Sequence, residues 1–583
     1  MKRLTGAEFL VEYFKCGGLK HVFGIPGHGN AAIVDVLYDL NKDMEFIPVK
    51  HERYGGHMAD GYFRATRKTP AVVTTSVGPG ATNLATALAT AYVDSSTFIA
   101  VTGDVQTYLL GKGIFQEIER QFQSDYINAM RHLTKRTYFV STVNQLNNVL
   151  PNALKEAVVG RPGPVLISMP MDVQVAYTEV ELTEVPLVTD VGRVYPDQTK
   201  VLEASKLLIR AERPLILIGG GVVMSEATEE VVKLAELLGA PVATTFRGDA
   251  KGGFPEDHEL NVFSVGNIGS PVANKLAAEA DIILAIGVTF SDETTSSYRR
   301  GITFNIPPTK LIQIDIDPHE IGKNYPVEVG IWGDAKVTLQ QLIKYIYNQG
   351  KKANYKETEY FKRISQMKSE WIDEIERLRK EVVMGIPNVV KILRETLSPE
   401  TIITLSAGLP QEIFSQLWVS YKPRTFISSG GFSTMGFALP AAIGAKLALK
   451  DTPVVAIEGD GSFLMNNIEL LTASQLELPV VVVVLNNYGW ISIRDLQIRN
   501  FQGRVIGTEF KNRRNELNAP DFEKVAKAYG AIYFKADDVK EIRSSVQEAL
   551  KLSDRPAVVE IPVENKFPYS GTKAYGFWDI PRR

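Results

Sequence analysis

The chain has 583 residues, of which 45% are hydrophobic and 22% are charged. This composition is ordinary for a globular protein with a substantial core, and at roughly 150 residues per domain the length allows three or four domains. The 64 basic and 67 acidic side chains nearly cancel, leaving a formal net charge of −3. A nucleic-acid or membrane-surface partner would need a basic face, so we expect neither.

Cysteine content and hydropathy predict a cytoplasmic protein. Cys16 is the single cysteine, which rules out an intrachain disulfide or a thiolate metal cluster and favours a reducing, intracellular setting. The longest apolar runs, such as 479–485, are far shorter than the roughly 20 residues that span a bilayer. Near the N-terminus, Glu8, Glu12 and Lys15 interrupt the apolar stretch that a secretion signal needs.

Short β-branched runs alternate with helical periodicity in three consecutive blocks, a pattern typical of parallel sheets with crossover helices. The first block, 1–175, has predicted strands at 21–23, 46–49, 71–75, 97–102 and 165–168. The second block, 190–347, has them at 214–218, 241–245, 282–286 and 310–314. The third block, 360–562, has them at 401–404, 425–428, 454–457, 480–485 and 557–561. We therefore expect an α/β chain of three consecutive domains, each an open parallel sheet flanked by helices.

Three further segments lie between or after these blocks. Segments 177–197 and 348–359 have little helical pattern or a polar composition, and we expect them to be linkers. The C-terminal tail, 563–583, contains Phe567, Tyr569, Tyr575, Phe577 and Trp578. So many exposed aromatic rings would favour aggregation, so this tail is expected to lie on a protein surface.

The most informative motif is Gly459-Asp460-Gly461, with Asn486-Asn487 following after 24 residues. The predicted strand 454–457 ends in this glycine-rich turn, whose amides can face a phosphate, and a helix is expected to begin near Leu464. A right-handed crossover returns the chain through 480–485 and places the two strand ends side by side. Asp460 and Asn487 can then bind Mg²⁺, with a backbone carbonyl, water and phosphate oxygens as the other ligands. Taken singly, each motif is more simply a turn.

Motifs along nearly the whole chain resemble those of thiamine-diphosphate (ThDP) dependent enzymes of the acetolactate synthase type. The segments that carry the resemblance are Phe23-Gly-Ile-Pro-Gly27, His51-Glu52, Gly56-His-Met-Ala-Asp-Gly-Tyr62, Ser76-Val-Gly-Pro-Gly-Ala-Thr-Asn83, Phe115-Gln-Glu117, Gly160-Arg-Pro-Gly-Pro164, Gly219-Gly-Gly221, Asp315-Ile-Asp-Pro318, Gly430-Gly431, Thr434-Met-Gly-Phe437 and the metal motif. The resemblance implies ThDP and Mg²⁺ as cofactors. It also implies a homodimer or a dimer of dimers whose active sites are shared between subunits.

The same resemblance implies roles for individual residues. Glu52 would hydrogen-bond the pyrimidine ring as the catalytic carboxylate, Gln116 would face the reacting centre, and His28 would move protons. Met435 would hold the cofactor in its bent shape. The other expected cofactor contacts are Gly27, Gly78, Asn83, Gly408, Ser433, Gly459, Gly461, Ser462, Asn487 and Gly489. The expected metal ligands are Asp460, Asn487 and Gly489.

Simpler structural roles stay open for four of these residues. Glu52 alone would be a surface residue before an amphipathic helix at 56–65. Met435 alone would be core filler, and Gln116 alone would be a solvated helix residue. His28 would be a helix-capping or structural residue.

The middle block carries a possible FAD site. Gly219, Gly220, Gly221, Thr245, Asp315 and Asp334 lie where the acetolactate synthase type binds FAD. Related enzymes keep a similar glycine pattern yet hold another nucleotide or none, and a glycine triplet alone is a weak signal. FAD is therefore one candidate among these.

Four places depart from the acetolactate synthase pattern near the expected substrate. The family has Lys where this chain has Met171, and Trp roughly where it has Arg494. It has Gly-Gln-His-Gln where this chain has Gly408-Leu-Pro-Gln411. An expected Arg for the carboxylate of the second oxo acid is replaced by Glu293, and this reversal of charge disfavours such an acceptor.

A second family resembles the chain locally. Trihydroxycyclohexane-1,2-dione hydrolases, which open a cyclic dione during inositol breakdown, are similar at 23–30, 74–83, 408–410, 459–465 and 507–510. The chain is shorter than is usual for that group and keeps Phe115-Gln-Glu117.

Three functions therefore compete. We expect a lyase or carboligase that decarboxylates a 2-oxo acid and transfers the acyl carbanion to a carbonyl acceptor. The alternative is a hydrolase of a cyclic 1,2-dione. An FAD-dependent 2-oxo acid oxidase ranks third, because no motif singles out an electron-acceptor site.

Overall fold

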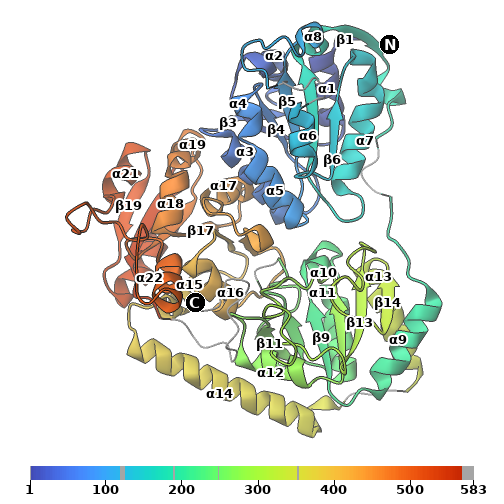
Figure 1. Ribbon diagram of the computed structural model, residues 1–583, viewed down its shortest axis with the longest axis vertical. Helices are drawn as coiled ribbons and strands as arrows, with labels where there is room; N and C mark the ends of the chain where they lie inside the picture. The colour runs from blue at the N-terminus through green and yellow to red at the C-terminus, as the bar shows by residue number, and fades with distance from the viewer. Residues whose placement is uncertain (1, 119–124, 188–190, 247–248, 351–353, 567–583) are drawn as a thin grey trace.

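Three six-stranded parallel sheets organise the chain in the computed structural model, which describes residues 2–118, 125–187, 191–246, 249–350 and 354–566 (Figure 1). The first sheet consists, from edge to edge, of β3 (Glu45–Pro48), β2 (His21–Gly24), β4 (Val72–Thr75), β5 (Ile99–Asp104), β7 (Val165–Pro170) and β6 (Arg136–Phe139). The middle sheet consists of β11 (Asn261–Ser264), β10 (Val242–Thr244), β9 (Pro214–Ile218), β12 (Ile282–Ile286), β13 (Lys310–Asp315) and β14 (Val329–Trp332). The third consists of β16 (Phe426–Ser428), β15 (Ile402–Leu405), β17 (Val454–Gly459), β18 (Val481–Asn486), β20 (Ala557–Pro562) and β19 (Ile532–Lys535). The predicted fold class is confirmed.

The helices cover both faces of these sheets. With the first sheet lie α1 (Gly6–Cys16), α2 (Ala31–Leu40), α3 (Glu52–Thr66), α4 (Pro79–Thr82), α5 (Ala85–Val93), α6 (Asp125–Arg131), α7 (Leu146–Val158) and α8 (Met171–Val175). With the middle sheet lie α9 (Gln198–Arg210), α10 (Gly220–Met224), α11 (Thr228–Leu238), α12 (Pro271–Glu279) and α13 (Ala335–Asn348). With the third lie α15 (Ile386–Thr396), α16 (Leu409–Leu417), α17 (Ala438–Ala448), α18 (Asp460–Asn466), α19 (Leu470–Gln475), α20 (Ile491–Asn500), α21 (Phe522–Ala528) and α22 (Val539–Leu550). The long helix α14 (Glu359–Glu381) runs from the middle unit to the third along the edge of the molecule (Figure 1).

Every strand expected from the sequence is present, with its ends shifted by no more than two residues. The strands that the sequence did not indicate are β6, β11, β14 and β19, which lie at sheet edges, and the pair β1 (Lys2–Thr5) and β8 (Tyr177–Val180). Most of these strands are partly exposed and carry polar residues, which weakens the apolar run that marks a strand.

Both expected linkers contain regular structure. The prediction for 177–197 is wrong in its first four residues, because β8 pairs with β1 in a two-stranded antiparallel sheet. In the second, α14 already begins at Glu359, where the side chain of Thr358 accepts a hydrogen bond from the backbone N–H of Phe361. The aromatic residues of the predicted surface tail lie in 567–583, outside the described residues.

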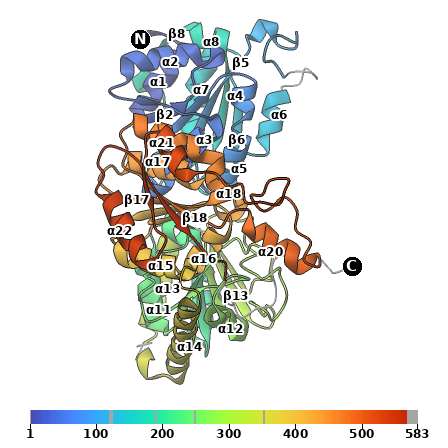
Figure 2. The same ribbon diagram turned by 90° about the vertical axis from the view of Figure 1, so that its left-hand side faces the viewer.

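The first and third units share one hydrophobic core. Met58 and Ala59 of α3 are buried in the same cluster as Ala441 and Ile443 of α17 and the valines of β18. Figure 2 shows α3 and α17 lying together between the two sheets. Among the described residues, no helix combines the length and the apolar character needed to cross a bilayer.

His21, the first residue of β2, is a buried titratable group in this fold. Its ring is tilted against Tyr62 at 5.0 Å between centroids and stacks on Phe23 at 6.5 Å. Burial, helped by the charges of Lys450 and Lys20, lowers the pKa of His21 to about 4. The unfolded chain binds a proton at His21 more readily than the folded chain does. This stabilisation is therefore present above pH 6.5 and is lost as the pH falls toward 4.

We expect His21→Phe to reduce the acid sensitivity of the fold. Between pH 7 and pH 5 the wild-type protein should lose about 2 kcal/mol of stability through this histidine. Melting temperatures at the two pH values should therefore differ less for His21→Phe than for the wild type. The exposed His319 supplies the control. The melting temperature of His319→Gln should fall between the two pH values by as much as that of the wild type. Equal falls for all three proteins would contradict the assignment.

Candidate active site

The expected site residues lie where the strand order of each sheet reverses. Ligands of open α/β sheets bind outside the carboxyl ends of the strands at such a switch point. In the first sheet the reversal lies between β2 and β4, and the chain continues from these strands into Gly27 and Gly78. In the third sheet it lies between β15 and β17, which continue into Gly408 and Asp460. The topology therefore makes one edge of each sheet available for a ligand.

Glu52 begins α3, four residues earlier than the helix expected at 56–65. The side chain of His51 caps this helix by accepting a hydrogen bond from the backbone N–H of Arg53, which explains the earlier start. Glu52 is only 9% exposed, and its Oε2 accepts a hydrogen bond from Nδ2 of Asn83 at 2.9 Å. Its Oε1 lies beside Gly80, where a Cβ would approach to 3.1 Å. The structure thus brings Glu52 and Asn83 together across the Gly-Pro-Gly turn.

The backbone conformation of Gly78 and its close contact with a neighbouring carbonyl group both exclude a side chain at this position. Its φ of +62° is in the left-handed region, and a Cβ there would overlap the carbonyl oxygen of Gln116. Gln116 itself has a φ of +67°. The turn that contains it is tied down by Glu117, whose carboxylate accepts backbone hydrogen bonds from Gly113 and Ile114 at 2.6 and 3.2 Å. Gln116 therefore lies next to the turn that borders Glu52.

His28 lies at the same edge of the first sheet. It opens the short 3₁₀ helix η1 (His28–Asn30) and is exposed, while Gly29 donates a backbone hydrogen bond to Oγ of Ser76 at 3.1 Å. A Cβ on Gly27 would collide with the side chain of Ser76. Gly27 and His28 are therefore placed beside the segment that leads into Gly78.

Asp460 is the first residue of α18, so the helix begins four residues before the expected Leu464. Its Oδ1 accepts a hydrogen bond from the backbone N–H of Gly461 and its Oδ2 one from that of Gly489, both at 2.9 Å. Burial raises the pKa of Asp460 to about 6, although the backbone hydrogen bonds oppose the rise. A carboxylate this buried is stabilised by a nearby positive charge.

The amide of Asn487 and the carbonyl group of Gly489 converge on this carboxylate. The side-chain oxygen of Asn487 lies 3.2 Å from the carbonyl oxygen of Gly489 and 3.3 Å from Oδ1 of Asp460. Its Nδ2 meanwhile donates to Oδ1 of Asn565 at 3.1 Å. If the Asn487 amide were rotated by 180°, its nitrogen would instead donate to the Gly489 carbonyl and to Oδ1 of Asp460. A bound cation favours the orientation with the Asn487 oxygen toward Asp460, whereas without a cation the rotated orientation is favoured. One carboxylate, one amide oxygen and one carbonyl are ligands that suit Mg²⁺.

No described group of three or more histidine, cysteine, aspartate or glutamate side chains converges on a metal-sized space. The expected ligand set contains only one such residue, Asp460, so the donor set above is compatible with this finding.

The remaining expected contacts of the third unit surround the same turn. Pro410 packs toward Gly459, where a Cβ would lie 3.7 Å from its Cγ. Ser462 accepts a hydrogen bond from the backbone N–H of Gly436 at 2.9 Å and donates one to Glu458 at 2.6 Å. Ser433 donates to Oε1 of Gln411 at 3.3 Å. Ser462 is therefore bonded to the residue that follows Met435, and Ser433 is bonded to the helix that follows Gly408.

The start of α3 contacts the third unit of the same chain. The guanidinium of Arg53 donates to the carbonyl oxygen of Met435, and the hydroxyl of Tyr54 donates to that of Met465. Sequence reasoning missed both residues, although they directly follow Glu52. It also missed Glu458, a fully buried acid in β17 that could have been found as a charged residue inside an apolar strand.

All six residues expected around FAD line one cavity of about 440 Å³. The middle sheet has the 3-2-1-4-5-6 strand order of dinucleotide-binding folds, and its switch point lies between β9 and β12. These strands lead into Gly219 and Gly287, which border the cavity. The cavity is therefore located where this fold class binds nucleotides.

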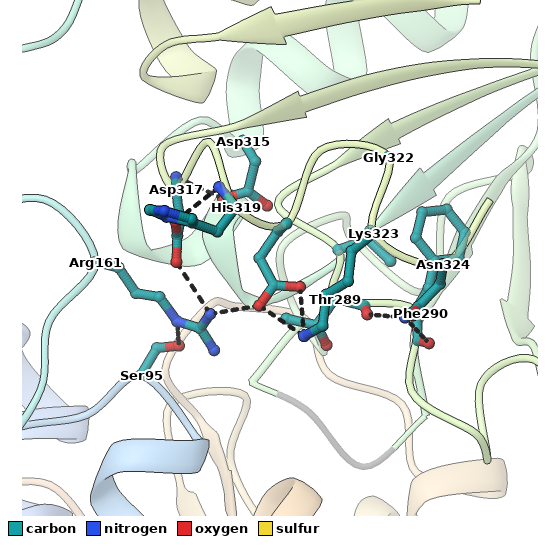
Figure 3. Close-up of polar contacts among 12 residues, drawn as sticks. Ser95, Arg161, Thr289, Phe290, Asp315, Asp317, His319, Gly322, Lys323 and Asn324 are labelled. Atoms are coloured by element: carbon teal, nitrogen blue, oxygen red, sulfur yellow. Dashed lines mark hydrogen bonds and ion pairs between the residues drawn. The ribbon is translucent and has the colours of Figure 1, made fainter. Parts of the chain in front are cut away.

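The first unit closes one side of this cavity. Figure 3 shows Arg161 reaching from the first unit toward Asp317, with the guanidinium 3.4 Å from the carboxylate. Arg161 also forms an ion pair with Glu320 at 2.8 Å and donates from Nε to Oγ of Ser95 at 2.8 Å. Burial raises the pKa of the neighbouring Asp315 to about 6.

The glycine triplet is explained only partly by packing. A Cβ on Gly219 or Gly221 would collide with Gly287, so these two are required by the fold. Gly220 has only Cβ of Asp249 nearby, at 3.9 Å, and opens toward the cavity. Asp334 is fully bonded within the protein, because it caps α13 and accepts from Arg193 and Ser225.

Arg67, also on the cavity wall, has unsatisfied donors. It ends α3 in the left-handed region and forms an ion pair with Asp249. Its side chain is 3% exposed, and its Nε and Nη1 have no hydrogen-bond partner in the described part of the chain. An anionic group in the cavity would satisfy them.

The four departures from the acetolactate synthase pattern have different surroundings. Arg494 pairs with Asp495 at 3.1 Å, whereas Trp490 is the ring next to Gly461, where a Cβ would lie 2.8 Å from its Nε1. The backbone carbonyl of Glu293 accepts from the N–H of Asn267 at 2.9 Å. Met171 opens α8. Trp490, four residues before Arg494 in the sequence, is therefore the tryptophan that lies beside the metal motif.

Three family models match the chain, one for each sheet. They are described as the N-terminal thiamine pyrophosphate (TPP) binding domain, the central domain and the C-terminal TPP binding domain of thiamine pyrophosphate enzymes. The matched residues are 4–124, 201–342 and 406–561 respectively. Thiamine pyrophosphate is another name for ThDP.

Similar proteins extend this match over nearly the full length. A probable acetolactate synthase large subunit of Methanocaldococcus jannaschii is 38% identical, covering 96% of this chain and 92% of that protein. The acetolactate synthase large subunit of Corynebacterium glutamicum is 35% identical, and the match covers 96% of this chain and 87% of that protein. The acetolactate synthase large subunit of Haemophilus influenzae is 34% identical, and the match covers 97% of this chain and 95% of that protein. The chain therefore belongs to the family of thiamine-diphosphate-dependent enzymes of the acetolactate synthase type.

Proposed function

We propose that this thiamine-diphosphate-dependent carboligase uses Mg²⁺, decarboxylates a 2-oxo acid and transfers the remaining acyl group to a carbonyl acceptor. The observation that carries the proposal is the convergence of Asp460, Asn487 and the Gly489 carbonyl beside a turn that the resemblance assigns to a diphosphate. The carboligase class follows from the relatives, several of which are acetolactate synthases.

Each end of the site has its own task in this proposal. The three oxygens hold Mg²⁺, and Gly408, Ser433, Gly459, Gly461 and Ser462 border the diphosphate. When bound, the thiazolium ring of ThDP supplies the carbon nucleophile and the electron sink.

Glu52 has the second task, which is to hold a proton at the pyrimidine ring. Asn83 occupies its Oε2, which fixes the carboxylate and leaves Oε1 for the ring nitrogen. Met435 supports the bend of the cofactor, and Gln116 and His28 face the substrate from the first unit.

FAD is the proposed occupant of the cavity in the middle unit. The strand order, the open face of Gly220 and the unsatisfied donors of Arg67 support a nucleotide with an anionic diphosphate. The residues present fit such a group, because Gly220 and Arg67 both line the cavity. We assign it no part in the reaction.

Assembly and location follow the resemblance and the composition. Two copies of the chain, or two such pairs, would complete active sites shared between subunits. The balanced charge and single cysteine support a cytoplasmic setting.

Hydrolysis of a cyclic 1,2-dione is the second candidate. It is favoured by Gly408-Leu-Pro-Gln411, because Pro410 packs at Gly459 in the place of the family's histidine. A screen with ThDP and Mg²⁺ separates the two. CO₂ release from pyruvate or another 2-oxo acid, with a coupled product in mass spectrometry, supports the carboligase. Ring opening without CO₂ supports the hydrolase.

Glu52→Gln should lower turnover by about a hundredfold or more, because the amide cannot take the proton that the carboxylate shares with the ring. The dissociation constant for ThDP should stay close to the wild-type value, since Asn83 and the diphosphate contacts remain. Steady-state CO₂ release and fluorescence titration measure the two quantities. Near-normal turnover of Glu52→Gln would show that another residue has this role.

Asp460→Asn should weaken Mg²⁺-dependent ThDP binding by about a hundredfold, because it removes the only carboxylate among the proposed ligands. Isothermal titration calorimetry with and without Mg²⁺ measures the change. Asp521→Asn is the matched control, since Asp521 caps α21 at the start of a helix of the same unit and touches no proposed ligand. Equal binding by both variants would argue against a metal at Asp460.

Gly220→Val should reduce flavin binding without unfolding the protein, since its side chain would project into the cavity. Flavin absorbance of the protein after incubation with FAD and desalting measures retention, and a melting curve measures stability. Gly219→Ala should instead lower the melting temperature, because the added Cβ would collide with Gly287. Wild-type protein that retains no flavin would contradict the FAD assignment.

A further inference from the structure

Glu469 connects the helical stretch that begins at Asp460 to the segment that carries Glu52 in the same chain. It ends the 3₁₀ helix η7 (Asn467–Glu469), which directly follows α18, so one helical stretch runs from Asp460 to Glu469. Its side chain is fully buried. Its Oε1 accepts backbone hydrogen bonds from Lys50 at 3.0 Å and from His51 at 3.1 Å.

We infer that Glu469 is a positioning residue that fixes the backbone immediately before Glu52 and so aims the Glu52 carboxylate; the inference rests on the proposed role of Glu52.

The segment held in this way is the short connection between β3 and α3. β3 ends at Pro48 and α3 begins at Glu52. On one side, Val49 donates its backbone N–H to the carbonyl oxygen of Gly24 at 3.1 Å. Glu469 takes the next two N–H groups, so every backbone donor from Val49 to His51 is bonded. The start of α3 then has little freedom to shift.

Other contacts tie the same segment to the third unit through side chains. Nζ of Lys50 donates to Oε1 of Gln475 at 2.7 Å, and Arg53 and Tyr54 donate to the carbonyl oxygens of Met435 and Met465. In the described part of the chain, Glu469 alone supplies a third-unit side chain that binds the backbone N–H groups before Glu52. Loss of its carboxylate would leave those two buried donors unpaired.

The carboxylate of Glu469 is itself held in place. Its Oε2 accepts a hydrogen bond from the hydroxyl of Thr472 at 2.6 Å. Burial raises the pKa of Glu469 to about 7, and the backbone N–H groups of Lys50 and His51, the Thr472 hydroxyl and the charge of Lys50 oppose that rise. The same contacts that stabilise the acid are those that hold the Glu52 segment.

The test compares variants by a reaction step that depends on Glu52. Exchange of the hydrogen at C2 of bound ThDP for deuterium, followed by NMR after acid quench, reports that step. In Glu469→Ala, exchange should slow by about tenfold or more, because a displacement of the order of 1 Å is enough for such losses. The dissociation constant for ThDP should stay within a factor of about three, since the diphosphate contacts are intact.

Two further variants separate positioning from simple stabilisation. Glu469→Gln keeps an oxygen that accepts both N–H groups, so it should restore exchange to near the wild-type rate. Glu230→Ala removes another buried carboxylate, which accepts from Gln340 in the middle unit. It should lower the melting temperature but leave exchange unchanged. If Glu469→Ala does not fold, Glu469→Asp takes its place. The aspartate side chain is one methylene shorter, which moves the carboxylate away from the N–H groups of Lys50 and His51, so C2 exchange should be equally slow.

The outcomes distinguish this inference from the proposal on which it rests. Slow exchange in Glu52→Gln and Glu469→Ala, with rescue by Glu469→Gln, supports it. Slow exchange in Glu52→Gln but wild-type exchange in folded Glu469→Ala or Glu469→Asp overturns the role of Glu469 alone. Wild-type exchange in Glu52→Gln overturns the role of Glu52 and, with it, that of Glu469.

Discussion

The buried carboxylate of Asp460 is the constraint on which the rest of the site depends. Parallel pairing of β17 with β18, from Val455 opposite Val481 to Gly459 opposite Leu485, brings the ends of the two strands together. Asp460 then faces the amide of Asn487 and the carbonyl of Gly489. Its own hydrogen bonds come from backbone N–H groups, which offset only part of the cost of burying a charge. In the proposed function, a divalent cation among the three oxygens would supply the missing counter-charge and also a binding point for a diphosphate.

The packing of α3 against α17 fixes the first and third sheets relative to each other within one chain. Gly61 and Gly444 allow this approach, because a Cβ on either would collide with the backbone of the other helix, at Ala441 and Met58 respectively. The two sheets consequently share a core, and the beginning of α3 is pressed against α18 and η7. Glu52 and Asp460 of one chain belong to different units, so their relative position depends on this helix pair and on the contacts at its ends.

The sequence predicted most of the fold for a physical reason. Strands covered on both faces, such as β18 with its run of valines, appear as continuous apolar runs, whereas the exposed edge strands β6, β14 and β19 do not. The local motifs singled out Glu52 and Asn83, which are hydrogen-bonded in the structure. They also singled out six residues of the middle unit, all of which line one cavity. The start of α18 was placed too late because its first turn consists of residues typical of loops. Glu469 and Arg67 carry no local motif. The backbone groups that Glu469 binds, at Lys50 and His51, are more than 400 residues away in the sequence, and Arg67 is recognisable only by its donors that have no partner in the described part of the chain.

Anomalous scattering tests the central claim most directly. Crystals grown with ThDP and Mn²⁺ in place of Mg²⁺ should give an anomalous difference peak among Oδ1 or Oδ2 of Asp460, Oδ1 of Asn487 and the carbonyl oxygen of Gly489. The Asn487 amide should then keep its nitrogen toward Asn565. A fully occupied cofactor with no peak at these oxygens, or with the amide turned over to donate to Asp460, would contradict the account.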